Sequence, residues 1–419
     1  MSILDVKELC SSYVNNLETY IMFQIKQETV RLKPELEAKG RAPIALSMGA
    51  PVQNPPEFVI EELKKATEEV GIHSYSTPKG EPFFLEAVSK RMKNRFGVDV
   101  CPKTEIFSLI GSKEGLSNTF KTIINPKYDD KEKDIILIPD PGYASYVDQI
   151  KVAGGYPYGM KLLAEDNYMP DLDKVWEDVK KAGLDVEKVK ALVINYPNNP
   201  LGFGASREYL QKVVDFCREK KILLISDAAY VDMYFEENER PASILEFEGA
   251  KDVAIEFHSF SKPYAMTGWR LGWVCGNKDV VGAIGRYKST VDTGIYKAIQ
   301  KAGAVVLNSK EGDEYIINSN KGFKVKQQIV IDGFKELGWD MDNIQVSNST
   351  FYLWLPIPPR YSCAKDFAKD LLNTSGVVIV PGEAFGTDCE RYFRLSYVAS
   401  DDSLREVISR MKEDGFSFN

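Results

Sequence analysis

The sequence predicts an α/β fold, in which a large domain with a mostly parallel central sheet between helices is joined to a smaller α+β domain. Short apolar runs alternate with helical patterns from about residue 56 onward. This alternation changes after about residue 307, where strands and helices follow one another less regularly. The 419 residues are 44% hydrophobic and 27% charged, so there is apolar material for a large core.

The N-terminal segment, residues 1–55, is expected to pack with the small domain. Apolar side chains recur every three to four residues over 1–40, a spacing that predicts a helix. A stretch rich in proline and glycine over 41–56 ends this segment.

The large domain is placed at residues 56–305. Amphipathic spacing predicts helices over 57–70, 81–95, 113–124, 206–220 and 278–290. Short apolar runs predict strands over 106–110, 134–139, 191–196, 222–227, 253–257 and 271–275. Strands that are apolar on both faces and separated by helices are typical of a parallel sheet covered on both sides.

The small domain is placed at residues 306–419. Its pattern predicts, in order, a helix, a strand, a helix, two strands and a closing helix, over 320–337, 350–355, 363–372, 377–380, 392–397 and 403–412. This order indicates an α+β unit.

Composition and charge exclude several classes of function. The chain has 53 Lys and Arg against 61 Asp and Glu, and a net charge of −8 would repel a nucleic-acid backbone. No apolar run reaches the ~18 residues of a membrane span, and no signal peptide is visible, so we expect a cytoplasmic protein without a membrane partner. The two histidines and the scattered cysteines favour neither a metal site nor a Ser–His–Asp hydrolase. A general base is expected among lysine, tyrosine and the carboxylates.

The densest cluster of reactive residue types follows the predicted strand over 253–257. Ser259, Ser261 and Arg270 can all donate hydrogen bonds to a phosphate group. Lys262 stands among them in an apolar stretch, where burial and neighbouring cations lower the pKa of an amine and make it a nucleophile for Schiff-base chemistry. A solvated lysine in a strand–loop–strand unit is the alternative.

Other polar residues follow neighbouring strands, and ligands of open α/β sheets bind beyond the carboxyl ends of strands. Asp227 ends the strand over 222–227, where a buried carboxylate needs a cation such as a protonated pyridine nitrogen, unless it caps a helix. Asn199 lies in an N-N-P-x-G turn, which turn chemistry alone also explains. Ser112 and Lys113 begin a helix after the strand over 106–110, and helix N-termini bind anions.

Together these pieces fit pyridoxal phosphate. Its aldehyde would meet Lys262, its ring nitrogen Asp227, and its phenolic oxygen Asn199 and Tyr230, with the phosphate on the remaining donors. In the order N-P-x-G, D-x-x-Y, S-x-S-K and R-x-G-W, the sequence over 47–396 resembles the class I/II aminotransferases, the fold-type I pyridoxal-phosphate enzymes. The resemblance implies that Lys262 forms the internal aldimine and shuttles the substrate proton.

The resemblance also implies roles for further residues. Asp227 would pair with the pyridinium, Asn199 and Tyr230 would contact the phenolic oxygen, and Tyr143 would stack on the ring. The phosphate would be held by Ser112, the backbone of Lys113, Ser259, Ser261 and Arg270. The family implies a homodimer in which Tyr75 reaches the neighbouring subunit's site. Substrate would be bound by Gly49, Asn199 and Arg394, the last at its α-carboxylate.

Without the resemblance, Tyr75 and Tyr143 would be interpreted as ordinary half-buried aromatic residues and Arg394 as an ordinary surface arginine. Within the family, the segments over 255–273 and 288–300 are most similar to the bacterial LL-diaminopimelate aminotransferases of lysine biosynthesis. Two residues depart from that subgroup. Leu201 replaces the usual threonine of N-P-T-G and removes a hydroxyl, and Ala265 stands where an asparagine is expected.

The resemblance therefore implies an aminotransferase that moves an amino group between an L-amino acid and 2-oxoglutarate by ping-pong chemistry, with LL-2,6-diaminopimelate as the best substrate. Aspartate, alanine or aromatic amino acids are alternative substrates, and a β-lyase on the same fold is an alternative reaction, because the cofactor stabilises whichever carbanion forms. A regulator without turnover is a third class. Residues 1–40 are too short and not basic enough for the DNA-binding domain that such regulators carry.

Overall fold

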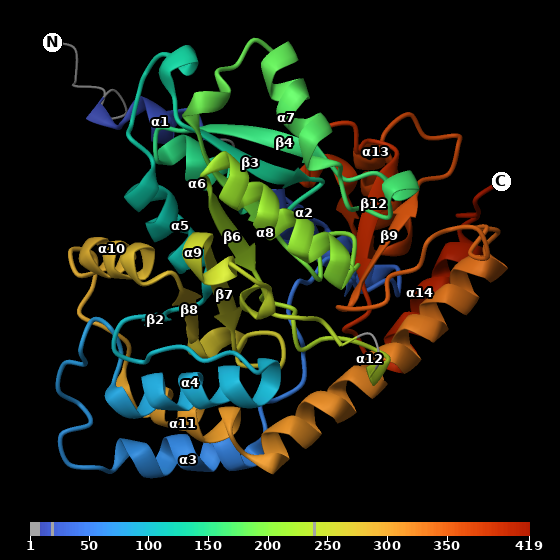
Figure 1. The fold of residues 1–419 in the computed structure, drawn as a ribbon. Coiled ribbons are helices and arrows are strands. Elements are labelled where there is room, and N and C mark those ends of the chain that lie inside the picture. Colours follow the sequence, from blue (N-terminus) through green and yellow to red (C-terminus); the bar gives the residue numbers. More distant parts are fainter. Residues whose placement is uncertain (1–8, 18–20, 238–239) are drawn as a thin grey trace, which may run out of the picture.

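A seven-stranded sheet forms the centre of the large domain in the computed structural model, which describes residues 9–17, 21–237 and 240–419 (Figure 1). The strand order is β2-β8-β7-β6-β5-β3-β4, with bounds Ile106–Leu109, Gly272–Gly276, Ala254–Ser259, Leu223–Asp227, Val189–Ile194, Ile135–Asp140 and Tyr156–Lys161. β8 is antiparallel to both of its neighbours, and the other pairs are parallel. The predicted mostly parallel sheet is confirmed.

Helices cover both faces of this sheet, because successive strand residues point to opposite sides. In β6, Leu224 faces one core and Ile225 faces the other. The core around Leu224 is closed by α4, α7, α8 and α11, with bounds Pro82–Phe96, Leu172–Lys181, Arg207–Lys220 and Lys297–Leu307. The core around Ile225 is closed by α5, α6 and α10, with bounds Ser112–Ile123, Ser145–Val152 and Lys278–Lys288. α3, Glu57–Thr67, packs on α11, and the short α9 spans Ala250–Val253.

Several elements of the large domain were not predicted. β4, α6 and α7 lie between residues 140 and 190, and α11 precedes the small domain. β4 reads Tyr-Pro-Tyr-Gly-Met-Lys, and Pro157 and Gly159 are residues that normally indicate a turn. The strand tolerates them because it is the edge of the sheet, where a missing backbone donor breaks no ladder.

The small domain holds a three-stranded antiparallel sheet in the order β11-β12-β9, with bounds Val380–Pro381, Tyr392–Ser396 and Tyr352–Pro356. Three helices accompany it: α12, α13 and α14, with bounds Lys310–Glu336, Ala364–Ser375 and Asp401–Glu413. The strand predicted over 377–380 is two strands in different sheets. β10, Val377–Val378, pairs with β1, Ile44–Ala45, and β11 pairs with β12.

The N-terminal segment is not one helix, so the prediction of a continuous helix over 1–40 is wrong. α1 spans only Ser12–Asn15 and α2 spans Ile21–Ala38, while residues 1–8 and 18–20 of that prediction lie outside the described residues. α1 has no buried residue to anchor a longer helix. α2 buries Leu32 and Leu36 against α13 and β10, which supports the proposed grouping of this segment with the small domain.

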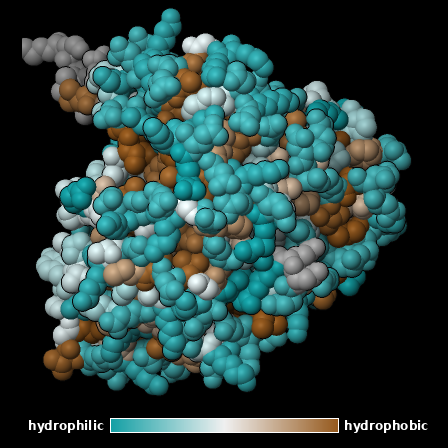
Figure 2. All heavy atoms as spheres, in the orientation of Figure 1, coloured by the Kyte–Doolittle hydropathy of each residue, from teal (hydrophilic) through white to brown (hydrophobic). Residues whose placement is uncertain are grey.

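The face drawn in Figure 2 is mostly hydrophilic, with hydrophobic side chains in scattered patches. Among the helices of the described residues, none is long and apolar enough to cross a membrane.

Candidate active site

A cavity of about 390 Å³ lies where the parallel strands of the large domain end and the small domain faces them. We call it the catalytic cavity. Twelve of the thirteen predicted site residues line it: Gly49, Ser112, Lys113, Tyr143, Asn199, Asp227, Tyr230, Ser259, Ser261, Lys262, Arg270 and Arg394. They come together because β6 and β7 are parallel neighbours that end at Asp227 and Ser259, on the same edge of the sheet.

Asp227 is a buried carboxylate with one oxygen held and the other open. Tyr146 donates a hydrogen bond to Oδ2 at 2.7 Å, and within the described residues Oδ1 has no hydrogen-bond partner. Burial raises the pKa of Asp227, while the hydrogen bond from Tyr146, the backbone N–H of Ala229 and the charge of Lys262 oppose that rise. An open, buried carboxylate oxygen is costly unless a donor or cation meets it.

Asn195 and Asn199 connect this aspartate to the end of the neighbouring strand β5. Asn195 Nδ2 donates to the backbone oxygen of Asp227 at 2.8 Å, and its Oδ1 accepts from the backbone N–H of Asn199 at 2.9 Å. The turn after β5 is thereby fixed relative to the end of β6.

Lys262 enters the cavity from the loop after β7. Its Nζ donates to the backbone oxygen of Gly49 and lies 5.8 Å from the centre of the Tyr230 ring. Burial lowers the pKa of Lys262 to about 8, with Arg394 and Arg270 adding to the effect and Asp227 opposing it. At such a pKa a substantial fraction of the amine is neutral near pH 8, the form that attacks a carbonyl group.

Donors for an anion gather at the start of α5. Gly111 precedes the helix at φ +112°, and a Cβ on it would lie 2.4 Å from Nη2 of Arg270. Arg270 itself has a left-handed φ of 57° and donates to the backbone oxygen of Thr267 at 2.8 Å. Ser259 and Ser261 lie beside it, with the Ser261 N–H bonded to Ser259 Oγ at 3.1 Å. A guanidinium, hydroxyls and a helix N-terminus form a site suited to phosphate.

Arg394 comes from β12 of the small domain and is almost fully buried. Its Nη1 donates to Asn199 Oδ1 at 2.8 Å and its Nη2 to the backbone oxygen of Ser47 at 2.9 Å. The guanidinium lies between two aromatic rings, 4.3 Å from the centre of Tyr352 and 4.8 Å from that of Phe385. Its Nε has no partner among the described residues, so a donor remains for a carboxylate.

Tyr230 and Tyr352 close the cavity beside Lys262. Their hydroxyl groups are 2.9 Å apart, and burial raises the pKa of Tyr230 well above its ordinary value. The hydroxyl of Tyr352 would lie 3.0 Å from a Cβ on Gly49, so a side chain at this position would force Tyr352 to shift.

Three residues singled out in the sequence lie elsewhere. Tyr75 does not line the cavity of its own chain, and its side chain is 85% exposed. Leu201 is buried with Trp354 and Phe385 and does not line the cavity, so the missing threonine hydroxyl is replaced by apolar packing. Ala265 has a φ of 53°, a left-handed conformation in which asparagine is more favourable than alanine.

No role is predicted from the sequence for Tyr146, Tyr352 or Phe385. Tyr146 lies in the first turn of α6, three residues after Tyr143, and the closeness of the two tyrosines in the sequence could have indicated that both serve one site. Tyr352 and Phe385 carry no local signal, because the fold of the small domain alone brings them to Arg394.

The comparisons with known proteins decide the family. The family model described as "Aminotransferase class I and II" matches residues 41–411. The chain belongs to the class I and II aminotransferases. Relatives include the LL-diaminopimelate aminotransferase of Syntrophobacter fumaroxidans, 40% identical over 93% of this chain and 96% of that protein, and that of Aquifex aeolicus, 40% identical over 92% and 95%.

Solved structures agree with this aminotransferase assignment. Substrate-bound BacF from Bacillus subtilis has a TM-score of 0.89 at 32% identity, covering 98% of both chains. The aspartate aminotransferase of Thermus thermophilus with maleate has a TM-score of 0.85 at 26% identity, covering 97% of this chain and 99% of that one. This chain is a fold-type I, pyridoxal-phosphate-dependent aminotransferase.

The residues of the catalytic cavity fit pyridoxal phosphate. The open Oδ1 of Asp227 suits a protonated ring nitrogen, and the amine of Lys262 suits an aldehyde. Because Gly111 has no side chain, the guanidinium of Arg270 can lie against the start of α5, where its donors suit a phosphate group. The cavity thus offers partners for the ring nitrogen, the aldehyde and the phosphate of this cofactor.

Proposed function

We propose that this aminotransferase transfers an amino group between LL-2,6-diaminopimelate and 2-oxoglutarate in lysine biosynthesis. The observation that carries the proposal is the similarity to relatives named LL-diaminopimelate aminotransferase, at 40% identity over more than nine-tenths of the chain. The two substrates would bind in turn at the catalytic cavity, which gives ping-pong kinetics.

The chain's own residues supply binding and proton transfer. Pyridoxal phosphate, when bound, withdraws electrons from the Cα of the amino acid. Asp227 would hold the ring nitrogen in its cationic form, and Arg394 would orient the substrate by its α-carboxylate. Lys262, with its lowered pKa, would take the Cα proton and return it to C4′ of the cofactor.

The remaining predicted residues complete this assignment. Asn199 and Tyr230 would contact the phenolic oxygen, and Tyr143 would stack on the ring. Asn199 already accepts a hydrogen bond from Arg394, so it would connect cofactor and substrate binding. The phosphate would be held by Ser112, the backbone of Lys113, Ser259, Ser261 and Arg270. Gly49 would let its backbone approach the substrate.

We also propose that the enzyme is a cytoplasmic homodimer in which Tyr75 reaches the phosphate site of the neighbouring subunit. Tyr75 is exposed in its own chain, although the family resemblance places a tyrosine there at a phosphate. Its neighbourhood presents further exposed apolar side chains, Val70 and Tyr296 among them, which a partner subunit would cover.

An amino-donor screen tests the substrate. Purified enzyme loaded with pyridoxal phosphate is mixed with 2-oxoglutarate and LL-diaminopimelate, aspartate, alanine or aromatic amino acids, and glutamate formation is measured. We expect LL-diaminopimelate to give the highest kcat/KM. A higher value for another donor would contradict the substrate assignment. Release of ammonia and pyruvate from cystathionine without any 2-oxo acid would instead indicate a β-lyase.

A further inference from the structure

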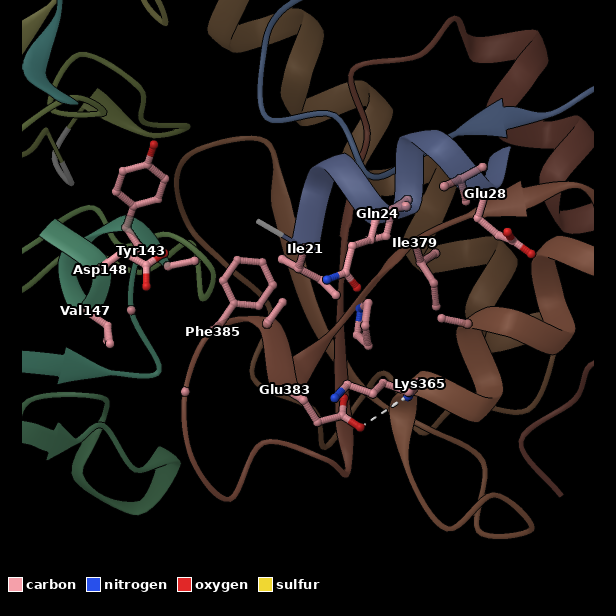
Figure 3. Close-up of a pocket in the computed structure, with 18 of the residues that line it drawn as sticks. Ile21, Gln24, Glu28, Tyr143, Val147, Asp148, Lys365, Ile379, Glu383 and Phe385 are labelled. Atoms are coloured by element: carbon pink, nitrogen blue, oxygen red, sulfur yellow. Dashed lines mark hydrogen bonds between the residues drawn. The ribbon is translucent and has the colours of Figure 1, made fainter. Parts of the chain in front are cut away.

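A second cavity, of about 720 Å³, adjoins the catalytic cavity. We call it the side pocket. The two cavities share five lining residues: Ile21, Tyr143, Ala144, Ala384 and Phe385. Figure 3 shows Phe385 lying between Tyr143 on one side and Ile21 of α2 on the other. The side pocket is therefore the direct neighbour of the cavity in which Arg394 and Lys262 lie, and Phe385 is part of their common wall.

The side pocket is lined by both apolar and charged side chains. Apolar side chains come from α2, α6 and α13 and from the strands beside them: Ile25, Ile138, Val147, Leu372 and Ile379. The charged residues are Glu28, Asp148, Lys151, Lys365, Lys369 and Glu383. A pocket that combines apolar and charged side chains suits a substrate with a methylene chain and a charged terminus.

Glu383 is the acidic group that needs a partner. Its Oε1 accepts the backbone N–H of Lys365 at 3.3 Å, a contact drawn in Figure 3. Its Oε2 is buried and has no hydrogen-bond partner in the described part of the chain. A carboxylate in this state is stabilised by an ammonium group that donates to the open oxygen.

The lysines of the side pocket can bind a negatively charged group such as a carboxylate. No ion pair among the described residues involves Lys151, Lys365 or Lys369. Glu28 accepts two hydrogen bonds from Arg31, and these bonds, with a smaller contribution from the charge of Lys369, lower its pKa. Lys365 and Lys369 are one helical turn apart on α13, so both can face one carboxylate.

Glu383 lies on the same short segment as Phe385, a residue that lines both cavities. The ring of Phe385 lies 4.8 Å from the guanidinium of Arg394, and Glu383 precedes Phe385 by two residues, at most roughly 7 Å along the backbone. The two amino-bearing carbons of 2,6-diaminopimelate are separated by four C–C bonds of about 1.5 Å, which span roughly 5 Å when extended.

We propose that the side pocket binds the distal end of an amino donor that ends in a second amino-acid head group, with Glu383 taking its ammonium and Lys369, helped by Lys365, taking its carboxylate. This inference rests on the proposed function, because it assumes that the α-carboxylate of the donor is at Arg394. Glu383 and Lys369 are thus residues that determine specificity.

Glu383 also has a structural role, which the test must distinguish from the binding of an ammonium group. Its bond to the N–H of Lys365 lies in the first turn of α13, where an acidic group stabilises a helix. Glu383→Gln keeps an amide oxygen for this N–H but removes the charge that an ammonium requires. A melting temperature near that of the wild type shows that the capping contact survives.

The experiment compares four donors with 2-oxoglutarate as acceptor. LL-2,6-diaminopimelate carries both distal groups, L-lysine only the ammonium, L-2-aminoheptanedioate only the carboxylate, and L-norleucine neither. The wild type, Glu383→Gln and Lys369→Gln are assayed, with Glu187→Gln, an exposed residue outside both cavities, as the matched control.

For Glu383→Gln, we expect the kcat/KM ratios of diaminopimelate to 2-aminoheptanedioate and of lysine to norleucine to fall about 10- to 100-fold. For Lys369→Gln, the ratios of diaminopimelate to lysine and of 2-aminoheptanedioate to norleucine should fall instead. Ratios unchanged from the wild type overturn the inference.

The donor assay of the wild-type enzyme alone tests two further points. If it uses norleucine as well as lysine, Glu383 recognises no ammonium and the inference fails, even where a variant does not fold. If it uses lysine and alanine but not diaminopimelate, the proposed substrate is wrong, and the lysine-to-norleucine ratio still tests Glu383.

Discussion

At the scale of single residues, Tyr146 determines how Asp227 is presented. The tyrosine hydroxyl holds Oδ2 at 2.7 Å, and the side-chain amide of Asn195 holds the backbone oxygen of the same residue. Within the described parts of the chain, Oδ1 has no hydrogen-bond partner. A carboxylate held in this way needs little reorganisation when a cationic ring nitrogen arrives.

Tyr146→Phe removes that hydrogen bond and should weaken the binding of pyridoxal phosphate about 10- to 100-fold, because hydrogen bonds to charged groups are worth about 1.5–3 kcal/mol. The bond lowers the pKa of Asp227, so its loss raises that pKa further and favours the neutral acid. The loss of affinity should therefore be larger near pH 6 than near pH 8. Titration of the apoenzyme followed by absorbance measures it.

Tyr209→Phe is the matched control for this variant. Tyr209 is a tyrosine of α8 whose hydroxyl donates to the backbone oxygen of Pro170 at 3.1 Å, away from the catalytic cavity. It should lose a similar hydrogen bond without a change in cofactor affinity. Equal affinities for both variants and the wild type would remove Tyr146 from this role.

At the scale of elements, the start of α5 shapes the anion site. Gly111→Ala places a methyl group within 2.4 Å of the Arg270 guanidinium at a positive φ. We expect at least a tenfold weaker affinity for pyridoxal phosphate, because Arg270 must move, together with a loss of about 1 kcal/mol in the free energy of unfolding. Affinity titration and denaturant unfolding measure the two effects.

Gly183→Ala separates backbone strain from the contact with Arg270. Gly183 also has a positive φ, of 76°, but a Cβ there would meet nothing within 4 Å. It should lose stability and keep its affinity for the cofactor. If both variants bind the cofactor like the wild type, the close approach of Arg270 to Gly111 is not needed for phosphate binding.

Much of the catalytic cavity could be predicted because parallel strands end at one edge. The sequence places Asp227, Asn199 and Lys262 after successive apolar runs, and such runs form neighbouring parallel strands in this chain. The local sequence was therefore enough to predict that these three residues lie in one site. The central strands and the helices that flank them were predictable for the same reason, since their apolar periodicity is strong.

Other parts of the structure depend on contacts that local sequence does not contain. β4 was missed because Pro157 and Gly159 are tolerated only at a sheet edge. The side pocket depends on tertiary packing, because α2 and α13 are separated by more than 300 residues and meet through Leu36 and Leu372. A periodic pattern shows which face of each helix is apolar, but not which helix it meets.

At the scale of the whole molecule, both domains contribute to one site. Arg394 of the small domain bonds Asn199 of the large domain, and Tyr230 of the large domain bonds Tyr352 of the small one. A movement of one domain relative to the other would therefore alter substrate binding and the surroundings of Lys262 together.

Mixed dimers test whether Tyr75 acts in the neighbouring subunit. Lys262→Ala and Tyr75→Ala homodimers should both have low activity. In the mixed dimer, the intact Lys262 and the intact Tyr75 meet in one site only if Tyr75 acts across the interface. Co-expression with two affinity tags isolates that dimer. We expect about half of the wild-type activity per dimer, and activity no higher than that of the Tyr75→Ala homodimer would contradict the arrangement.

The most direct test of the account is borohydride reduction of the enzyme with pyridoxal phosphate, followed by peptide mass mapping over a range of pH. We expect the cofactor on the peptide that carries Lys262. Since the pKa of Lys262 is about 8, the rate at which apoenzyme captures the cofactor should rise about tenfold per pH unit below that value and level off above it. An unmodified Lys262, or modification of another lysine, would contradict the account.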